Sequence, residues 1–216
     1  MAQPIVIAYH LIWTAYGWWL PNDPRGSSSS TISTDVLAML GELHEGRKTV
    51  QPASSDIRKF YAAAQTFLKH ELRTFDQSGR EILAESFAEV IAEQKYTCYA
   101  CAIMPDHVHL VIRKHRDVAE VMIEKLQSAS AGRLCEAASG WGRDHPVWGG
   151  PGWKVFLDHP DEVERTIGYV QRNPDPLGMP RQHWPFVAAY DRWPLHRGHS
   201  PNSPYVKRLR AAGRYP

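Results

Sequence analysis

The stretch that decides the fold is AIMPDHVHLVI, residues 102–112. An apolar run reaches a Pro-Asp turn, and a strongly alternating segment leaves it. Successive side chains of a strand point to opposite faces, so His107 and His109 should share one face. The opposite face should carry three large aliphatic residues, namely Val108, Leu110 and Ile112. The pattern predicts two strands joined by a tight turn, with two imidazoles on one side.

Two imidazoles at positions i and i+2 of a strand lie close enough to bind one divalent cation together. The alternative is a pair of surface histidines on a half-exposed strand, and a bare His-x-His pattern does not separate the two interpretations. The pair begins its strand directly after the Pro105–Asp106 turn, which favours a metal site.

The length and net charge of the chain limit its domain organisation and the kind of partner it can have. A chain of 216 residues is long enough for one domain with a substantial core, and its formal net charge of +2 gives no argument for a polyanionic partner. The C-terminal residues 191–216 form a basic tail, because no acidic residue follows Asp191. The basic residues of this tail are Arg192, Arg197, Lys207, Arg208, Arg210 and Arg214. Such a tail favours contact with nucleic acid, with simple solvation as the alternative.

The three cysteines give no disulfide framework. Cys98 and Cys101 form a C-x-x-C, but a separation of three along a strand predicts opposite faces and a reduced, structural role. The N-terminal residues lack a charged segment followed by a long apolar run, and no 18-residue apolar span occurs. We therefore expect a cytoplasmic protein with no membrane contact.

The N-terminal part begins with a predicted buried strand at 5–14, in which packing is the simpler interpretation of His10. The Gly- and Pro-rich segment 16–26 follows, with Trp18 and Trp19 beside Arg25. These side chains are suited to stacking on bases, and the alternative is a loop pinned to the core by its two indoles.

Residues 27–75 carry the weakest pattern. Helices at 35–45 and 56–70 are expected there, and the whole stretch is interpreted as an insertion into the domain. Clearer helical periodicity returns at 79–95, with a stripe of Leu83, Phe87, Val90 and Ile91. A capped helix from Asp117 to about residue 138 and a short strand at 154–157 follow.

A second chemical signature lies in the helix that His159-Pro160 should open and Pro174 should close. Its apolar stripe is Val163, Ile167 and Val170, and Tyr169 points away from that stripe. Asn173 follows Tyr169 by one helical turn on the same face. An off-core tyrosine with an amide one turn away is a weak signal when it occurs alone.

Together the two signatures resemble the HUH single-strand nucleases. Met104-Pro-Asp-His-Val-His-Leu110 is similar to their His-hydrophobic-His motif, and Tyr169-Val-Gln-Arg-Asn-Pro174 resembles the nucleophile helix of the REP-associated tyrosine transposases. The N-terminal pattern Tyr9-His10-Leu…Asp23-Pro24-Arg25-Gly26 also resembles a subgroup of these. The resemblance covers roughly 5–26 and 76–190, so we expect residues 1–190 to be the transposase domain.

This resemblance implies an α+β fold, ferredoxin-like or RRM-like, with an antiparallel sheet, helices on one face and a homodimeric assembly. It implies that Tyr169 is the nucleophile and that His107, His109 and Asn173 hold Mg²⁺ or Mn²⁺. Asn173 stands where the family often has Gln, which makes the third ligand a departure. The implied partner is single-stranded DNA, as a hairpin or palindromic repeat.

The implied activity is metal-dependent nicking and rejoining of DNA through a 5′-phosphotyrosine, as in DNA transposition. The alternatives are a non-catalytic nucleic-acid-binding domain of the same fold and a metal phosphoesterase that uses water, with Tyr169 structural. The residues expected to contact DNA are Trp18, Trp19, Arg25, Arg113, Lys114, Arg172, Lys207, Arg208 and Arg210.

Overall fold

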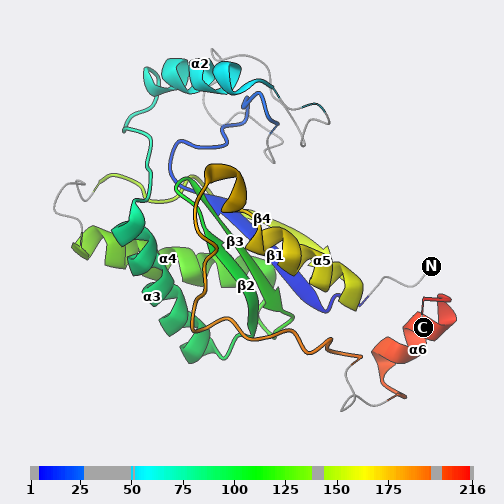
Figure 1. The fold of residues 1–216 in the computed structure, drawn as a ribbon. Coiled ribbons are helices and arrows are strands. Elements are labelled where there is room, and N and C mark those ends of the chain that lie inside the picture. The colour runs from blue at the N-terminus through cyan, green and yellow to red at the C-terminus, as the bar shows by residue number, and fades with distance from the viewer. Residues whose placement is uncertain (1–4, 27–49, 51, 138–143, 196–200, 215–216) are drawn as a thin grey trace.

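The fold is built on a four-stranded antiparallel sheet with the strand order β2-β3-β1-β4 (Figure 1). The structure is a computed structural model that describes residues 5–26, 50, 52–137, 144–195 and 201–214; the helix expected at 35–45 lies outside them. The strands are β1 (Ala8–Thr14), β2 (Cys98–Ile103), β3 (His107–Arg113) and β4 (Trp153–Leu157). The predicted hairpin thus occupies one half of the sheet, and β1 lies between β3 and β4.

Helices connect the strands in the order of two interleaved β-α-β units. They are α2 (Ser54–Gln65), α3 (Gln77–Gln94), α4 (Ala119–Ala137), α5 (Pro160–Gln171) and α6 (Pro204–Ala211), with a short 3₁₀ helix at Asp175–Leu177. This sheet order and connectivity confirm the predicted ferredoxin-like α+β fold. No helix in the described ranges is both long and apolar enough to cross a membrane.

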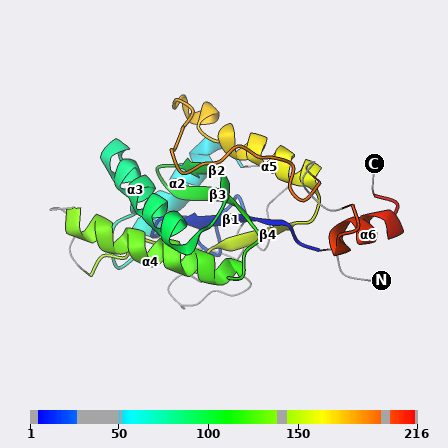
Figure 2. The same cartoon turned by 90° about the horizontal axis from the view of Figure 1, so that it is seen from below.

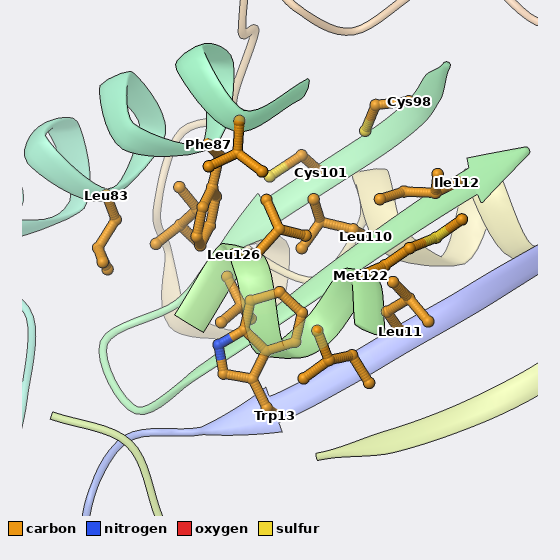
Figure 3. Close-up of a cluster of buried hydrophobic side chains, with 14 of the residues drawn as sticks. Leu11, Trp13, Leu83, Phe87, Cys98, Cys101, Leu110, Ile112, Met122 and Leu126 are labelled. Atoms are coloured by element: carbon orange, nitrogen blue, oxygen red, sulfur yellow. The ribbon is translucent and has the colours of Figure 1, made fainter. Parts of the chain in front are cut away.

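The main core lies between the sheet and the pair α3 and α4 (Figure 3). Leu11 and Trp13 of β1 meet Leu83 and Phe87 of α3 there, and all four are at most 1% exposed. The aliphatic residues of the histidine strand also point into this core. Full burial of each such side chain stabilises the fold by about 1.5–3 kcal/mol, so the alternation in β3 and the stripe in α3 are both confirmed.

The opposite face of the sheet carries α5, which Figure 2 shows on the side away from α4. Val163 and Val170 are fully buried there. The strands present small residues to them, Ala8, Ala100 and Ala102, so the helix can approach closely. We expected helices on one face only. The histidine face is instead partly covered, and its open part lies beside α5.

The outer edge of β2 is covered by a coil segment, residues 182–188, which we call the strap. The Gln182 amide donates to the Ile103 carbonyl and accepts from the Ile103 amide, both at 2.8 Å. Farther along, the Ala188 amide donates to the Cys98 carbonyl at 2.8 Å. Paired in this way, the edge offers few free backbone groups to another chain.

The prediction that Cys98 and Cys101 lie on opposite faces is wrong. The register between β2 and β3 shifts between Cys98 and Ala100, and this irregularity adds one residue to β2. Both thiols therefore enter the main core as free cysteines. Burial raises the pKa of the Cys98 thiol to about 12, so the pair stays protonated and unreactive near neutral pH.

Candidate functional site

The two histidines of the motif lie side by side on one face of β3, as predicted. Their ring centroids are 4.9 Å apart and the rings are nearly perpendicular. His109 is 5% exposed, whereas His107 at the start of the strand is partly exposed. The motif thus has one buried imidazole, His109, and one that solvent reaches, His107.

His107 is oriented by its neighbour in the turn. Its Nδ1 lies 2.6 Å from Oδ1 of Asp106, so the ring donates this hydrogen to the carboxylate. Burial raises the pKa of Asp106, but the hydrogen bond and charge of His107, with a contribution from Arg25, outweigh it and lower that pKa overall. The carboxylate is therefore ionised, and its hydrogen bond to Nδ1 leaves Nε2 of His107 to face another partner.

His109 is oriented by His10 of β1, a residue for which sequence reasoning favoured simple packing. His10 Nε2 lies 2.9 Å from His109 Nδ1, and the two rings stack with centroids 5.1 Å apart. Burial lowers the pKa of His10 to about 4, and burial with the two neighbouring imidazoles lowers that of His109 well below 6.5. Both rings are thus neutral near pH 7, and one donates to the other.

Tyr169 of α5 stands over this pair. Its ring centroid is 5.7 Å from that of His109 and 6.0 Å from that of His10, both edge-on. The helix begins as predicted, with the His159 side chain accepting from the Asp161 amide and Pro160 in the first turn. Because Val163 and Val170 fix the buried stripe, Tyr169 remains 43% exposed while facing the histidines. Residues from β1, β3 and α5 therefore meet at one point.

The donor set fits a divalent cation of the kind expected. Nδ1 of His107 and of His109 is each engaged by a neighbour, which leaves both Nε2 atoms as ligands. Within the described residues, no group of three or more His, Cys, Asp or Glu could hold a metal ion. A third ligand would therefore be an amide, water or phosphate oxygen. The Asn173 side-chain nitrogen donates to the Tyr169 carbonyl at 3.2 Å, so this amide lies at the C-terminal end of α5.

The N-terminal loop is tied down by side chains that we expected to contact DNA. The Trp18 indole donates to the Arg73 carbonyl at 2.7 Å. The Arg25 guanidinium covers the Trp19 ring at 3.9 Å and donates to Asp23 at 2.7 Å and to the Tyr61 hydroxyl at 2.9 Å. Tyr61 belongs to α2, so the cluster joins the loop to that helix. These contacts agree with the alternative of a loop pinned to the core.

The remaining candidates for DNA contact are spread over the surface. Arg113 stacks on Trp193 at 3.9 Å, and six residues of strand place it roughly 20 Å from His107. Lys114 beside it is exposed, whereas Arg172 ends α5 near Gly168. Lys207, Arg208 and Arg210 are exposed on α6, which packs through Tyr205, Val206 and Leu209. The structure thus gathers Tyr169 and the histidines but not these cations.

The basic tail also makes contacts that its composition did not indicate. Arg192 pairs with Asp161 at 2.7 Å and with Glu164 at 2.5 Å, and Arg214 pairs with Asp158 at 3.1 Å. The Tyr205 hydroxyl donates to the Asp158 carbonyl at 2.8 Å. Arg192 and Arg214 therefore neutralise carboxylates in and just before α5.

Comparison with known proteins gives two kinds of match. Residues 64–156 match the family described as "Transposase IS200 like". The chain is also similar to a solved REP-associated tyrosine transposase bound to a REP hairpin, with a TM-score of 0.44 and 11% identity over 100% of this chain and 87% of that chain. A candidate transposase from Deinococcus radiodurans R1 has a TM-score of 0.36 and 14% identity over 80% and 94%.

No curated protein matches the chain. The family match includes the histidine motif and ends before α5, so Tyr169 lies beyond it. Over residues 64–156 the chain is thus similar to the IS200-like transposases, which confirms the relationship predicted from its motifs.

Proposed function

We propose that this chain is a transposase of the HUH type, which nicks and rejoins single-stranded DNA through a covalent bond between Tyr169 and a 5′ phosphate. The observation that carries the proposal is the position of the Tyr169 ring, 5.7 Å from that of His109. The match to IS200-like transposases over residues 64–156 supports the same activity.

His107 and His109 would hold Mg²⁺ or Mn²⁺ through Nε2, with Asn173 or water as a further ligand. When bound, the cation would neutralise charge on a nonbridging phosphate oxygen. Neutral imidazoles and an amide leave the full charge of the ion for the phosphate. His10 and Asp106 hold the two rings in the tautomer that ligation needs.

The reaction balances as a transesterification. Tyr169 loses its phenol proton, its oxygen forms a bond to phosphorus, and the bond from phosphorus to the 3′ oxygen breaks. The departing oxygen takes up a proton, which leaves a free 3′-hydroxyl. In the reverse step a 3′-hydroxyl attacks the phosphotyrosine and restores the phosphodiester, so joining needs no external energy source.

Trapping the covalent adduct tests this function. Hairpin-forming single strands from the DNA that flanks the gene are labelled on either side of the cut, incubated with protein and Mn²⁺, and denatured. Label should stay on the protein only from the 3′ side of the cut. Tyr169→Phe should form no adduct, whereas Tyr16→Phe, which removes a hydroxyl from the N-terminal loop, should behave as wild type.

The alternatives predict different results in the same assay. A non-catalytic nucleic-acid-binding domain would bind the strands and leave them intact. A phosphoesterase that uses water would cut them without an adduct, and Tyr169→Phe would still cut. Either result would reject the proposed function.

A further inference from the structure

A cavity of about 550 Å³ lies on the histidine face of the sheet, between β4 and α5. Ile12 and Val155 contribute its floor, and Arg165 and Thr166 contribute its wall from α5. His10 and Tyr169 also line it. The cavity is therefore continuous with the candidate catalytic residues.

Two exposed apolar side chains of β4 lie on the same face of the sheet as this cavity, and one of them, Val155, lines it. Val155 pairs with His10 and Trp153 with Ile12, so both point to the histidine face. Trp153 is 50% exposed and Val155 is 39% exposed. A group of exposed apolar side chains beside a cavity is typical of a binding surface.

The strand geometry that presents Trp153 is set by Gly152. This residue has a φ of +80°, and a Cβ there would lie 2.9 Å from the Ile12 carbonyl oxygen. Only glycine fits such a close approach in that conformation. The chain thus enters β4 tightly against β1, which places Trp153 opposite Ile12 of the cavity floor.

We propose that this cavity binds the base of a nucleotide adjacent to the phosphate that Tyr169 attacks. The inference rests on the proposed function, because that function puts a phosphate at the Tyr169 hydroxyl and a neighbouring nucleotide within reach of the cavity. An indole face and an aliphatic floor suit base stacking, and the Arg165 guanidinium suits a base edge or the next phosphate.

The polar and apolar composition of the walls favours a nucleotide over a protein surface. Arg165, Thr166 and Glu162 come from one side of α5, whereas Ile12 and Val155 face them from the sheet. A volume of about 550 Å³ lies within the range of about 300–1,000 Å³ of clefts that bind small ligands.

Fluorescence of 2-aminopurine tests the base site without requiring cleavage. The analogue is placed in turn at each single-stranded position of the hairpin strand and bound to the Tyr169→Phe protein. One position should be strongly quenched, and Trp153→Ala should restore most of its fluorescence. In the same background, Arg165→Ala should raise the Kd for that strand several-fold. Arg133→Ala, which removes a cation of α4 that pairs with Glu89, should not.

The outcomes separate the proposals. Quenching that depends on Trp153 supports the base site even if wild type forms no covalent adduct, a result that would reject only the proposed reaction. Quenching at no position, or quenching unaffected by Trp153→Ala, overturns the base site. Sedimentation that shows a dimer in wild type and a monomer in Trp153→Ala would assign this face to self-association and also overturn it.

Discussion

The two edges of the sheet differ in how they end. At β2 the strap pairs with the edge strand, and Gln182 reproduces the hydrogen bonds of a strand against Ile103. At β4 the sheet ends, within the described residues, without a further strand. Its outermost strand exposes Trp153, Val155 and Phe156.

This difference separates stability from chemistry. At the β2 edge, a polar side chain forms hydrogen bonds with the backbone of the strand, which protects the sheet from pairing with another chain. The β4 half leaves its aromatic side chains exposed and holds the cavity that Tyr169 and His10 share. We therefore expect substitutions on the β4 side to change DNA cleavage, and substitutions at the strap to change folding.

The largest expected effect is on the histidine pair. Replacing His107 and His109 together with alanine should abolish Mn²⁺-dependent cleavage, because no ligand pair remains to hold the ion at the phosphate. Cleavage of labelled hairpin strands measures this, and circular dichroism checks that the fold persists. His183→Ala, an exposed imidazole in the strap, is the matched control. A double variant that cleaves at the wild-type rate would show that the site is misassigned.

The next effect concerns His10. His10→Ala removes the partner that orients His109, and loss of such a partner typically weakens metal binding about 10–100-fold. Isothermal titration with Mn²⁺ in the absence of DNA measures it, so the result does not depend on activity. His10→Gln, which retains a side-chain acceptor, should recover part of the affinity. Unchanged Mn²⁺ affinity in His10→Ala would show that His10 only packs against its neighbours and does not orient a metal ligand.

Acid should destabilise the metal-free protein through His10 of β1. The pKa of His10 falls from 6.5 to about 4 on folding, so the unfolded chain binds a proton that the folded chain does not. The contribution of His10 to the free energy of unfolding is therefore complete above pH 6.5. It declines as pH falls toward 4, by up to about 3 kcal/mol. Urea unfolding with a chelator present measures the decline, and His10→Gln should flatten it. An equal decline in that variant would point to other groups.

At the strap, Gln182→Ala should lower the free energy of unfolding by about 1–3 kcal/mol, because two backbone groups of Ile103 lose their partner. Cleavage per folded molecule should be unchanged. Gln77→Ala, which removes only a surface bond to Glu81, should cost less than about 0.5 kcal/mol. A loss of cleavage in folded Gln182→Ala would contradict the separation of the two edges.

The smallest effect is expected from α6. Replacing Lys207, Arg208 and Arg210 with alanine should flatten the slope of log K against log salt by up to about 2, since each contact with a single-strand phosphate contributes about 0.7. Deleting the tail would test this less cleanly, because Tyr205, Val206 and Leu209 are buried. Arg192→Ala is the control, because that side chain already pairs with carboxylates of α5. An unchanged slope in the triple variant would show that these three side chains contact no DNA phosphate.

Local sequence patterns were enough to predict much of the fold. Alternation at residues 107–113, the stripe of α3 and the His159-Pro160 helix start all follow from interactions within a few residues, and each is confirmed. The exposed position of Tyr169 on α5 also followed from helical spacing. Such features depend little on where the rest of the chain lies.

The missed features depend on distant partners. His10 meets His109 across 99 positions of sequence, and only the register of β1 on β3 brings them together. The register shift between Cys98 and Ala100 depends on the pairing of β2 with β3, and no residue type at that position predicts it. Arg25 needed the docking of Tyr61 from α2 before its role in the loop became visible.

The place of β1 in the sheet has a consequence for synthesis. Ala8 pairs with Arg113 and Thr14 with His107, while Phe156 of β4 pairs with Tyr9 on the other side. At roughly 5–20 residues per second, a ribosome needs about 5–20 s to deliver the first of these partners after β1 has been made. During that interval an apolar segment containing Leu11, Ile12 and Trp13 has no strand to join. We expect this segment to be the main contact of the nascent chain with chaperones.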